Sequence, residues 1–383
     1  MSRTENCKYL DWPVFLLVTA LVFFGTIMIG SANGWVYNRE AFSLDGLMIK
    51  QLIGYSLGLI VIAFIMICDY SFLKTMAIPA YIFVLLLLIL VLKYGVGAEE
   101  NDNVSRWLPI FGDINIQPSE LCKISLTLML AWLLDRYQNQ INRFSVLVSV
   151  FFIAVFPLIL VFKEPDLSTS MVIVAIIAAA IFSAGLSWKY IIPSIIVAIT
   201  LVVVVYFDAI SDSPSILGEY QVDRILAWLY PEKYALTTAY QTIQSRTAIG
   251  SGALYGAGIF QNSGMVPVPT TDFIFGIIGE ELGFIGASIV ILLFLSLSLR
   301  ILWIAAHTED VFGKIICTGI AIMIAFQSAI HMGVSTALLP NTGLPLPFVS
   351  YGLSSLTANM MGIGLVLRIN AENKKNRLRR YGV

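Results

Sequence analysis

Long runs of apolar residues, separated by short polar segments, dominate the chain from residue 13 to residue 367. About twenty consecutive apolar residues allow an α-helix to cross the hydrocarbon core of a bilayer. The pattern therefore predicts an all-α, polytopic membrane protein with about ten crossing helices. The predicted helices cover residues 13–31, 47–67, 76–92, 121–134, 144–162, 169–184, 190–207, 273–299, 315–338 and 348–367.

Composition agrees with this pattern and narrows the class of protein. Hydrophobic residues make up 58% of the chain and charged residues 12%, and the mean hydropathy is +0.85, which is typical of helical membrane proteins. The net charge of −1 provides no basic field for nucleic acid. The four cysteines are scattered, which argues against a disulfide framework or a metal cluster. We expect one integral-membrane domain over residues 1–383, located in the cell membrane.

The first apolar run also has features of a secretory signal, with Ser31-Ala32-Asn33 as a cleavage site. It is long for a signal peptide, and few positive charges precede it. We therefore expect it to remain as the first helix.

Basic residues just after the last helix predict the orientation of the chain. Cytoplasmic segments of membrane proteins carry an excess of Lys and Arg, so the tail over residues 368–383 is placed in the cytoplasm. With an even number of helices the N-terminus, carrying Arg3 and Lys8, is cytoplasmic too. The bias is moderate, because four arginines then fall on the outer side: Arg39, Arg106, Arg224 and Arg246.

This topology leaves a large extracytoplasmic loop, residues 208–271, between the seventh and eighth helices. A loop of this length usually has a function. Apolar residues at helical spacing over 221–234 predict a short amphipathic helix, lying either in the membrane interface or as a cap over the bundle. Glycines at 250, 252, 256 and 258 follow. They favour close backbone packing or flexibility over a phosphate loop, because the strand–loop–helix context is missing.

Asp272 is the first candidate for chemistry. It stands at the start of the eighth predicted helix, with Glu280 and Glu281 shortly after it. Ionisable groups at membrane depth are costly, so such residues are by default functional. The alternative is that Asp272 only interacts with the positive end of the helix dipole.

Glu120 and Lys123 are the second candidates, because their spacing puts them on one face of the fourth helix. They could form a structural ion pair, which is the usual tolerated arrangement of charges in membranes. Alternatively, Lys123 could bind an anionic group of a substrate. Both Lys123 and Asp272 lie within about a turn of the outer ends of their helices, so they could face one cavity.

Several stretches together resemble one family, the shape, elongation, division and sporulation (SEDS) proteins of the RodA/FtsW/SpoVE group. Their order and spacing also fit the family. The stretches are Arg106-Trp107, Gln117-Pro118-Ser119-Glu120 with Lys123, Glu164-Pro165-Asp166-Leu167, Tyr240-Gln241 with Gln244-Ser245, residues 248–252, Thr271-Asp272-Phe273 with residues 279–283, and residues 343–352.

The resemblance implies a polytopic glycosyltransferase that polymerises peptidoglycan from lipid II outside the cytoplasmic membrane. It implies a class B penicillin-binding protein as the partner that supplies the transpeptidase. The catalytic aspartate of the family matches Asp272, and the paired acidic and basic residues of the family match Glu120 and Lys123.

The chain departs from the family pattern near these motifs. The family usually has Glu and His where Val268 and Thr270 stand. The other departures are Ala253 in place of a glycine, Ala257 in place of a basic residue, His331 in place of an asparagine, and Leu353 in place of a glycine. They bear on fine substrate contacts and leave Asp272 and the Glu120–Lys123 pair intact.

Polymerisation requires a base for the attacking sugar hydroxyl and positive charge for the diphosphate leaving group. We expect Asp272 to act as the base and Lys123, with outer arginines such as Arg106, Arg224 and Arg246, to bind the diphosphate. Mg²⁺ or Mn²⁺ could take the same role, although no ligand cluster is visible in the sequence. The remaining expected substrate contacts are Glu120, Gln244, Ser245, Glu281 and Ser350.

Two functions from other classes remain open at this stage. A flippase for a lipid-linked precursor would also need buried charges, but it predicts functional polar residues on the inner side as well. A non-catalytic scaffold of the elongation or division complex would not require the Asp272 motif. A polymerisation assay with labelled lipid II distinguishes the three.

Overall fold

The computed structural model describes residues 9–34, 44–97, 105–111, 114–211, 214 and 216–381. Arg3, Lys8 and Arg39, which contribute to the predicted charge bias, lie outside the described residues, as does Cys7. The three other cysteines, Cys68, Cys122 and Cys317, are free thiols.

The described residues form twelve α-helices and one small sheet, so the predicted all-α class is confirmed. Ten of the helices correspond to the ten apolar runs, with ends that differ by a few residues in most of them and by more in α3, α10 and α12. These are α1 (Trp12–Ala32), α2 (Gly46–Ile67), α3 (Tyr70–Tyr94), α4 (Pro118–Arg136), α5 (Phe144–Lys163), α6 (Leu167–Ser183), α7 (Trp188–Ala209), α10 (Ile274–Ala306), α11 (Val311–Ser335) and α12 (Leu353–Tyr381).

Six of these helices, α1, α2, α3, α5, α10 and α11, are long and apolar enough to cross a membrane. α6 and the first part of α7 are shorter apolar helices. Helices α4 and α12 carry more polar residues, and much of their surface is buried inside the protein. The structure therefore supports a polytopic membrane protein, and the count of ten crossings stays a prediction.

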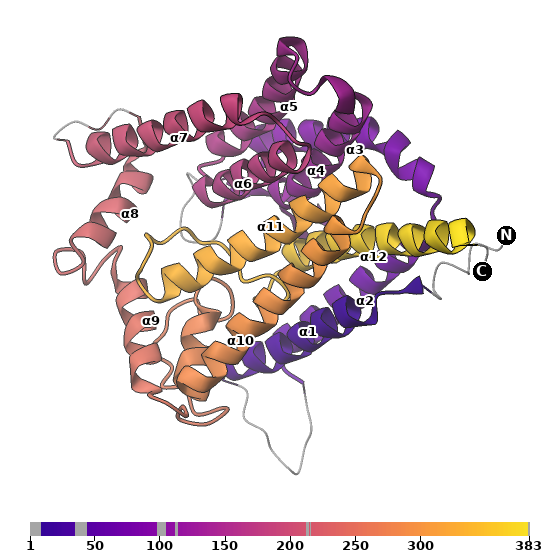
Figure 1. Cartoon of the computed structure of the whole chain (residues 1–383). Helices are drawn as coiled ribbons and strands as arrows, with labels where there is room; N and C mark the ends of the chain where they lie inside the picture. The colour runs from indigo at the N-terminus through magenta and orange to yellow at the C-terminus, as the bar shows by residue number, and fades with distance from the viewer. Residues whose placement is uncertain are drawn as a thin grey trace.

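The helices form a bundle with α10, α11 and α12 near its centre (Figure 1). The start of α1 and the end of α12 lie at one end of this bundle, where Asn370 donates a hydrogen bond to the carbonyl of Tyr9. Asp11 pairs at 2.8 Å with Arg300, near the end of α10. Helices α8 (Glu219–Leu229) and α9 (Tyr240–Ser251) lie at the opposite end.

Helix α8 confirms the short amphipathic helix predicted within the long loop, although α8 ends at Leu229 because Pro231 follows. Val222 is buried, and the indole of Trp228 donates a hydrogen bond to the carbonyl of Ala337, just beyond α11, at 3.2 Å. These contacts favour the cap over the bundle among the two alternatives for this helix.

A small antiparallel sheet, in the order β1-β2-β3, precedes α4 and was not predicted. The strands are short and contain a proline, so their alternation is too brief to be recognised. Leu108 pairs with Ile116, and this pairing fixes the position of Arg106 on β2. The strands are β1 (Val96–Gly97), β2 (Ser105–Phe111) and β3 (Ile114–Ile116).

The last helix differs from its predicted bounds at both ends. It begins at Leu353 instead of residue 348, because Pro345 and Pro347 cannot continue a helix and Phe348 has a φ of 65°. It continues to Tyr381, so most of the basic tail is helical.

Helix α10 is broken at Gly283, whose φ of 63° is not helical. The glycine-rich segment after α9 inserts its backbone at this break and satisfies the peptide groups that the break releases. Of the two predicted alternatives for these glycines, close backbone packing is therefore confirmed for Gly252 and Gly256. The hydrogen bonds run from Ala257 N to Glu280 O (2.9 Å), Gly258 N to Glu281 O (3.0 Å), Phe284 N to Ala253 O (2.9 Å) and Ile285 N to Leu254 O (3.2 Å).

Two glycines beside this break form a matched pair for a stability test. A Cβ at Gly252 would lie 2.0 Å from the carbonyl oxygen of Gly279, whereas a Cβ at Gly250 meets nothing within 4 Å. Neither residue has a positive φ. We expect Gly252→Ala to destabilise the protein by about 1–3 kcal/mol through overpacking. Gly250→Ala should be neutral or stabilising by up to about 1 kcal/mol. Thermal melting in detergent measures both, and equal melting temperatures would contradict the insertion.

Candidate active site

Asp272 lies in the turn before α10, beside Gly343 of the segment that joins α11 to α12. A Cβ built at Gly343 would lie 3.3 Å from Oδ2 of Asp272 and 3.7 Å from Nη1 of Arg224 on α8. The carboxylate and the guanidinium thus approach the same point from two elements. A side chain at position 343 would fill that space, and the φ of 69° at Gly343 also favours glycine.

The environment of Asp272 changes its acidity. Although the residue is only partly buried, burial of its carboxyl raises the pKa above the ordinary aspartate value. The charge of Arg224, a hydrogen bond with Thr271 and the charge of Arg106 each oppose this rise in pKa, while the charge of Asp166 adds to it. A raised pKa makes the ionised carboxylate a stronger base.

Arg106 reaches the site from β2 and is held by the turn between α5 and α6. Its Nε donates to the carbonyl of Glu164 at 3.2 Å, and Nη2 donates to the carbonyl of Pro165. Asp166 caps α6 by accepting the amide of Thr169 at 3.0 Å. The same turn therefore holds Arg106 at the second hollow, which it lines, and keeps the Asp166 carboxylate buried behind it.

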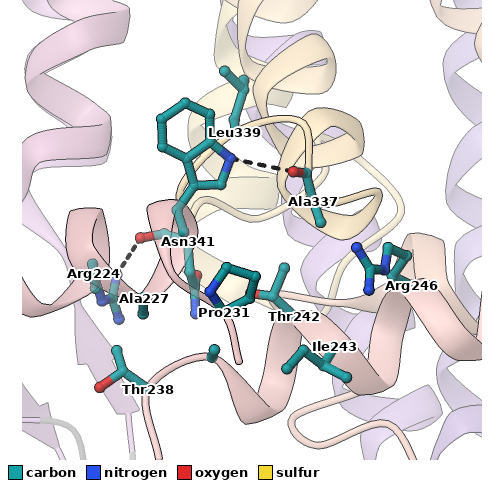
Figure 2. A pocket seen from close by; sticks show the side chains of 12 residues that line it. Arg224, Ala227, Pro231, Thr238, Thr242, Ile243, Arg246, Ala337, Leu339 and Asn341 are labelled. Atoms are coloured by element: carbon teal, nitrogen blue, oxygen red, sulfur yellow. Dashed lines mark hydrogen bonds between the residues drawn. The ribbon is translucent and has the colours of Figure 1, made fainter. Parts of the chain in front are cut away.

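Two hollows adjoin each other here, because Arg224 and Asn341 line both. The first also has Trp228 and Arg246 in its lining, and Figure 2 shows Arg246 with other residues of this hollow. The second is lined by Arg106 as well. Nη1 of Arg224 donates a hydrogen bond to the carbonyl of Asn341 at 3.2 Å, which is drawn dashed in Figure 2. The two hollows bring the predicted Arg106, Arg224 and Arg246 together. Asp272 lines neither hollow, and Arg224 links them to it through the point at Gly343.

Ser350 holds the turn that contains Asp272 in place. Its hydroxyl donates to the carbonyl of Thr271 at 2.6 Å and accepts the amide of Leu346 at 2.8 Å. The amide of Tyr351 donates to the carbonyl of Thr270 at 2.9 Å. Ser350 is buried, so in this structure it positions Asp272 and does not face either hollow.

Glu120 and Lys123 form a buried ion pair at 2.9 Å, with both side chains 1% exposed. Lys123 also donates to Oε1 of Gln327 on α11 at 2.9 Å, and Gln327 donates to the carbonyl of Pro345 at 3.0 Å. The pair thus connects α4 and α11 to the segment that contains Gly343. These contacts favour the structural alternative, and contact of Lys123 with a diphosphate stays a prediction.

The model of the FtsW, RodA and SpoVE family of cell cycle proteins matches residues 11–375. The chain belongs to this family. It is 33% identical over 365 residues to a probable peptidoglycan glycosyltransferase FtsW from Trichlorobacter lovleyi, covering 94% of this chain and 93% of the relative. It is 31% identical over 373 residues to the peptidoglycan glycosyltransferase MrdB of Escherichia coli K12, covering 96% and 95%.

A solved structure has the same fold. It was described as showing the structural coordination of polymerization and crosslinking by a peptidoglycan synthase complex. The TM-score is 0.78 at 28% identity, over 95% of this chain and 98% of that chain. The resemblance of the sequence to SEDS proteins is therefore confirmed, and with it a multi-pass membrane protein.

Three other residues expected to contact substrate in this FtsW/RodA/SpoVE protein, Gln244, Ser245 and Glu281, line neither hollow. The hydroxyl of Ser245 on α9 donates to the carbonyl of Ser335 at 2.9 Å, and Gln244 beside it is partly buried. Oε1 of Glu281 accepts from Ser31 of α1 and from Asn262 at 2.8 Å. In this structure Ser245 and Glu281 join elements together, and their contact with substrate stays a prediction.

Asp166, Asn341 and Gly343 were not among the predicted site residues of this family member, although the motifs quoted above contain Asp166 and Gly343. Asp166 follows a proline and precedes an apolar helix, which is also the pattern of an ordinary helix cap. Only the fold reveals that its charge acts on Asp272.

Departures from the family pattern occupy defined places in the structure. Nδ1 of His331 contacts the carbonyl of Leu344 at 2.7 Å, so the histidine holds the same segment as Gln327. Val268 has a φ of 48°, which is uncommon for a β-branched residue.

Among the residues that the structure describes, no three His, Cys, Asp or Glu side chains gather as a metal site would require.

Proposed function

We propose that this chain polymerises lipid II into glycan strands at the outer face of the cytoplasmic membrane, with Asp272 as the general base. Its membership of the FtsW, RodA and SpoVE family and its relatives identify it as a peptidoglycan glycosyltransferase of cell division or elongation. The observation that carries the site assignment is the approach of Asp272 and Arg224 to one open point at Gly343.

The proposed topology has ten crossings and two cytoplasmic termini. The start of α1 and the end of α12 share one end of the bundle, as an even number of crossings requires (Figure 1). The basic residues after α12 favour the cytoplasm for that end. Asp272, α8 and α9 then belong to the extracytoplasmic end, where the sugars of a lipid-linked substrate can react while its tail remains in the bilayer.

Asp272 would accept the proton of the attacking sugar hydroxyl. In this step the hydroxyl oxygen bonds to the anomeric carbon of the second sugar, and the bond from that carbon to the diphosphate breaks. The diphosphate leaves with the bonding electrons, and the proton is on the Asp272 carboxyl. A carboxyl whose pKa is raised by burial suits this role, because the ionised form is then the more basic.

The leaving diphosphate needs positive charge on the same surface. Arg106 and Arg224 line the second hollow, and Arg224 and Arg246 line the first. Planar guanidinium groups bind phosphate oxygens in pairs. Stabilisation of the developing charge is often the largest contribution to catalysis of this kind. We therefore assign the diphosphate to the surface formed by these arginines.

We also propose a class B penicillin-binding protein as the partner. The similar solved structure belongs to a complex that polymerises and crosslinks peptidoglycan. The residues around Asp272 suit polymerisation, so we assign crosslinking to a partner protein.

The test is polymerisation of labelled lipid II by the purified chain in detergent, alone and with a penicillin-binding protein from the same cell. We expect glycan strands that a muramidase degrades. Movement of lipid II across vesicle membranes without any polymer would contradict the proposal and favour a flippase. Absence of both activities in the complete complex would favour a scaffold.

A further inference from the structure

Glu164, in the turn between α5 and α6, is a buried acid that the proposed mechanism does not use. Its side chain is 1% exposed, and neither carboxyl oxygen has a hydrogen-bond partner among the described residues. An ionised carboxylate without partners is among the most costly groups to bury. This acid therefore needs a physical explanation.

The neighbouring Asp166 shows the opposite arrangement within the same turn. It is also buried, at 2% exposure, but its oxygens accept several hydrogen bonds. Donors stabilise the ionised form of a carboxyl, and their absence favours the protonated form. The absence of donors to Glu164 thus favours the protonated form of its carboxyl. The donors to Asp166 are Thr169 N, Thr169 Oγ1, Ser119 Oγ and Gln117 Nε2.

Arg106 does not neutralise Glu164 either. Its guanidinium donates to the backbone carbonyls of Glu164 and Pro165, and not to the Glu164 carboxyl. The turn thus holds the arginine through neutral oxygens, so the positive charge is not cancelled by a paired carboxylate. Arg106 also lines the second hollow, where the proposed function places an anion.

We propose that Glu164 is a positioning residue that stays a neutral acid at physiological pH and thereby keeps the wall of the second hollow cationic enough to bind the diphosphate. Ionisation of Glu164 would add a second negative charge beside Asp166 and offset Arg106. This inference rests on the proposed function for the role of Arg106, but the protonation state of Glu164 can be tested without it.

The charged and titratable groups around Glu164 come from three elements. They are Asp166 from the start of α6, Arg106 from β2 and Cys122 from α4. Burial and, after it, the charge of Asp166 raise the pKa of Glu164 to about 9 against the opposing charge of Arg106. The proton is therefore retained through the neutral range and lost only in alkaline solution.

The raised pKa of Glu164 makes the stability of the folded protein depend on pH. The unfolded chain ionises Glu164 near pH 4.5, whereas the folded chain retains the proton up to about pH 9. Between these values the folded state binds more protons, so stability falls as the pH rises and levels off above the folded pKa. Glutamine has the same shape and cannot ionise, so Glu164→Gln removes this loss.

The experiment compares wild type with Glu164→Gln in the full-length chain, using Glu232→Gln as the control at an exposed carboxyl. We expect Glu164→Gln to melt at the wild-type temperature near pH 5 and increasingly above it as the pH rises to 9. Glu232→Gln should follow wild type throughout. Identical melting of Glu164→Gln and wild type at every pH would overturn the proposal.

Polymerisation gives the second readout. Wild-type activity should fall above about pH 9, by about tenfold per pH unit for a single ionisation. Glu164→Gln should retain activity at pH 7 and lose this alkaline decline. A folded Glu164→Gln that is inactive at pH 7 would show that the acidic proton or the charge is needed, and would also overturn the proposal. Absence of polymer from wild type contradicts the proposed function instead, and leaves the melting result to decide the state of Glu164.

Discussion

Replacement of Asp272 by asparagine is expected to abolish glycan polymerisation while the protein remains folded. Asparagine keeps the shape of the side chain beside Gly343, but it cannot accept the proton of the attacking hydroxyl. Loss of a general base typically costs about 10²–10⁴-fold in rate. With lipid II as substrate, a loss of this size leaves no visible polymer in an ordinary gel assay.

The pH dependence of the wild-type enzyme gives an independent check of this assignment. Because burial raises the pKa of Asp272, the active, ionised form appears only as the pH rises through that value. Activity should therefore increase with pH in an acid limb that lies above the ordinary aspartate range. Thermal melting of Asp272→Asn provides the control for folding, and wild-type amounts of polymer from this variant would refute the role of the carboxylate.

The sequence predicted the helices well, because lipid imposes a strong constraint on composition. All ten apolar runs correspond to helices, and the glycines near residue 252 pack as expected against the broken α10. The predicted helix bounds are wrong where apolar residues continue across a turn. Phe348 and Val349 are fully buried but not helical. Their segment packs against α1 at Gly25, where an added Cβ would lie 2.5 Å from Val349 Cα.

The site was predicted only in part, because charge alone does not reveal which way a side chain faces. Arg106, Arg224 and Arg246 line two adjoining hollows and Arg224 approaches Asp272 at Gly343, while their contact with substrate stays a prediction. Lys123 carries the same charge and lies at the predicted end of its helix, yet it is 1% exposed and paired inside the bundle. Glu164 and Asp166 are two acids in one turn, and only the fold shows that Asp166 accepts several hydrogen bonds whereas the Glu164 carboxyl has no partner among the described residues.

Replacement of Lys123 by methionine is expected to have the largest effect on stability. It leaves the Glu120 carboxylate buried at 1% exposure without its partner, and breaking such a pair typically costs about 3–5 kcal/mol. It also removes the donor to Gln327, and with it one support for the carbonyl of Pro345. The single variant should therefore melt well below wild type and lose activity along with its fold.

The double variant Glu120→Gln with Lys123→Met separates the structural role of this pair from a role in substrate binding. It removes both charges, so most of the lost stability should return. If Lys123 only supports the bundle, polymerisation should return with the melting temperature. If Lys123 binds the diphosphate, the double variant should be stable and remain inactive. The contacts with Glu120 and Gln327 lead us to expect the first result, and a stable but inactive double variant would show that Lys123 leaves its buried position to reach the substrate.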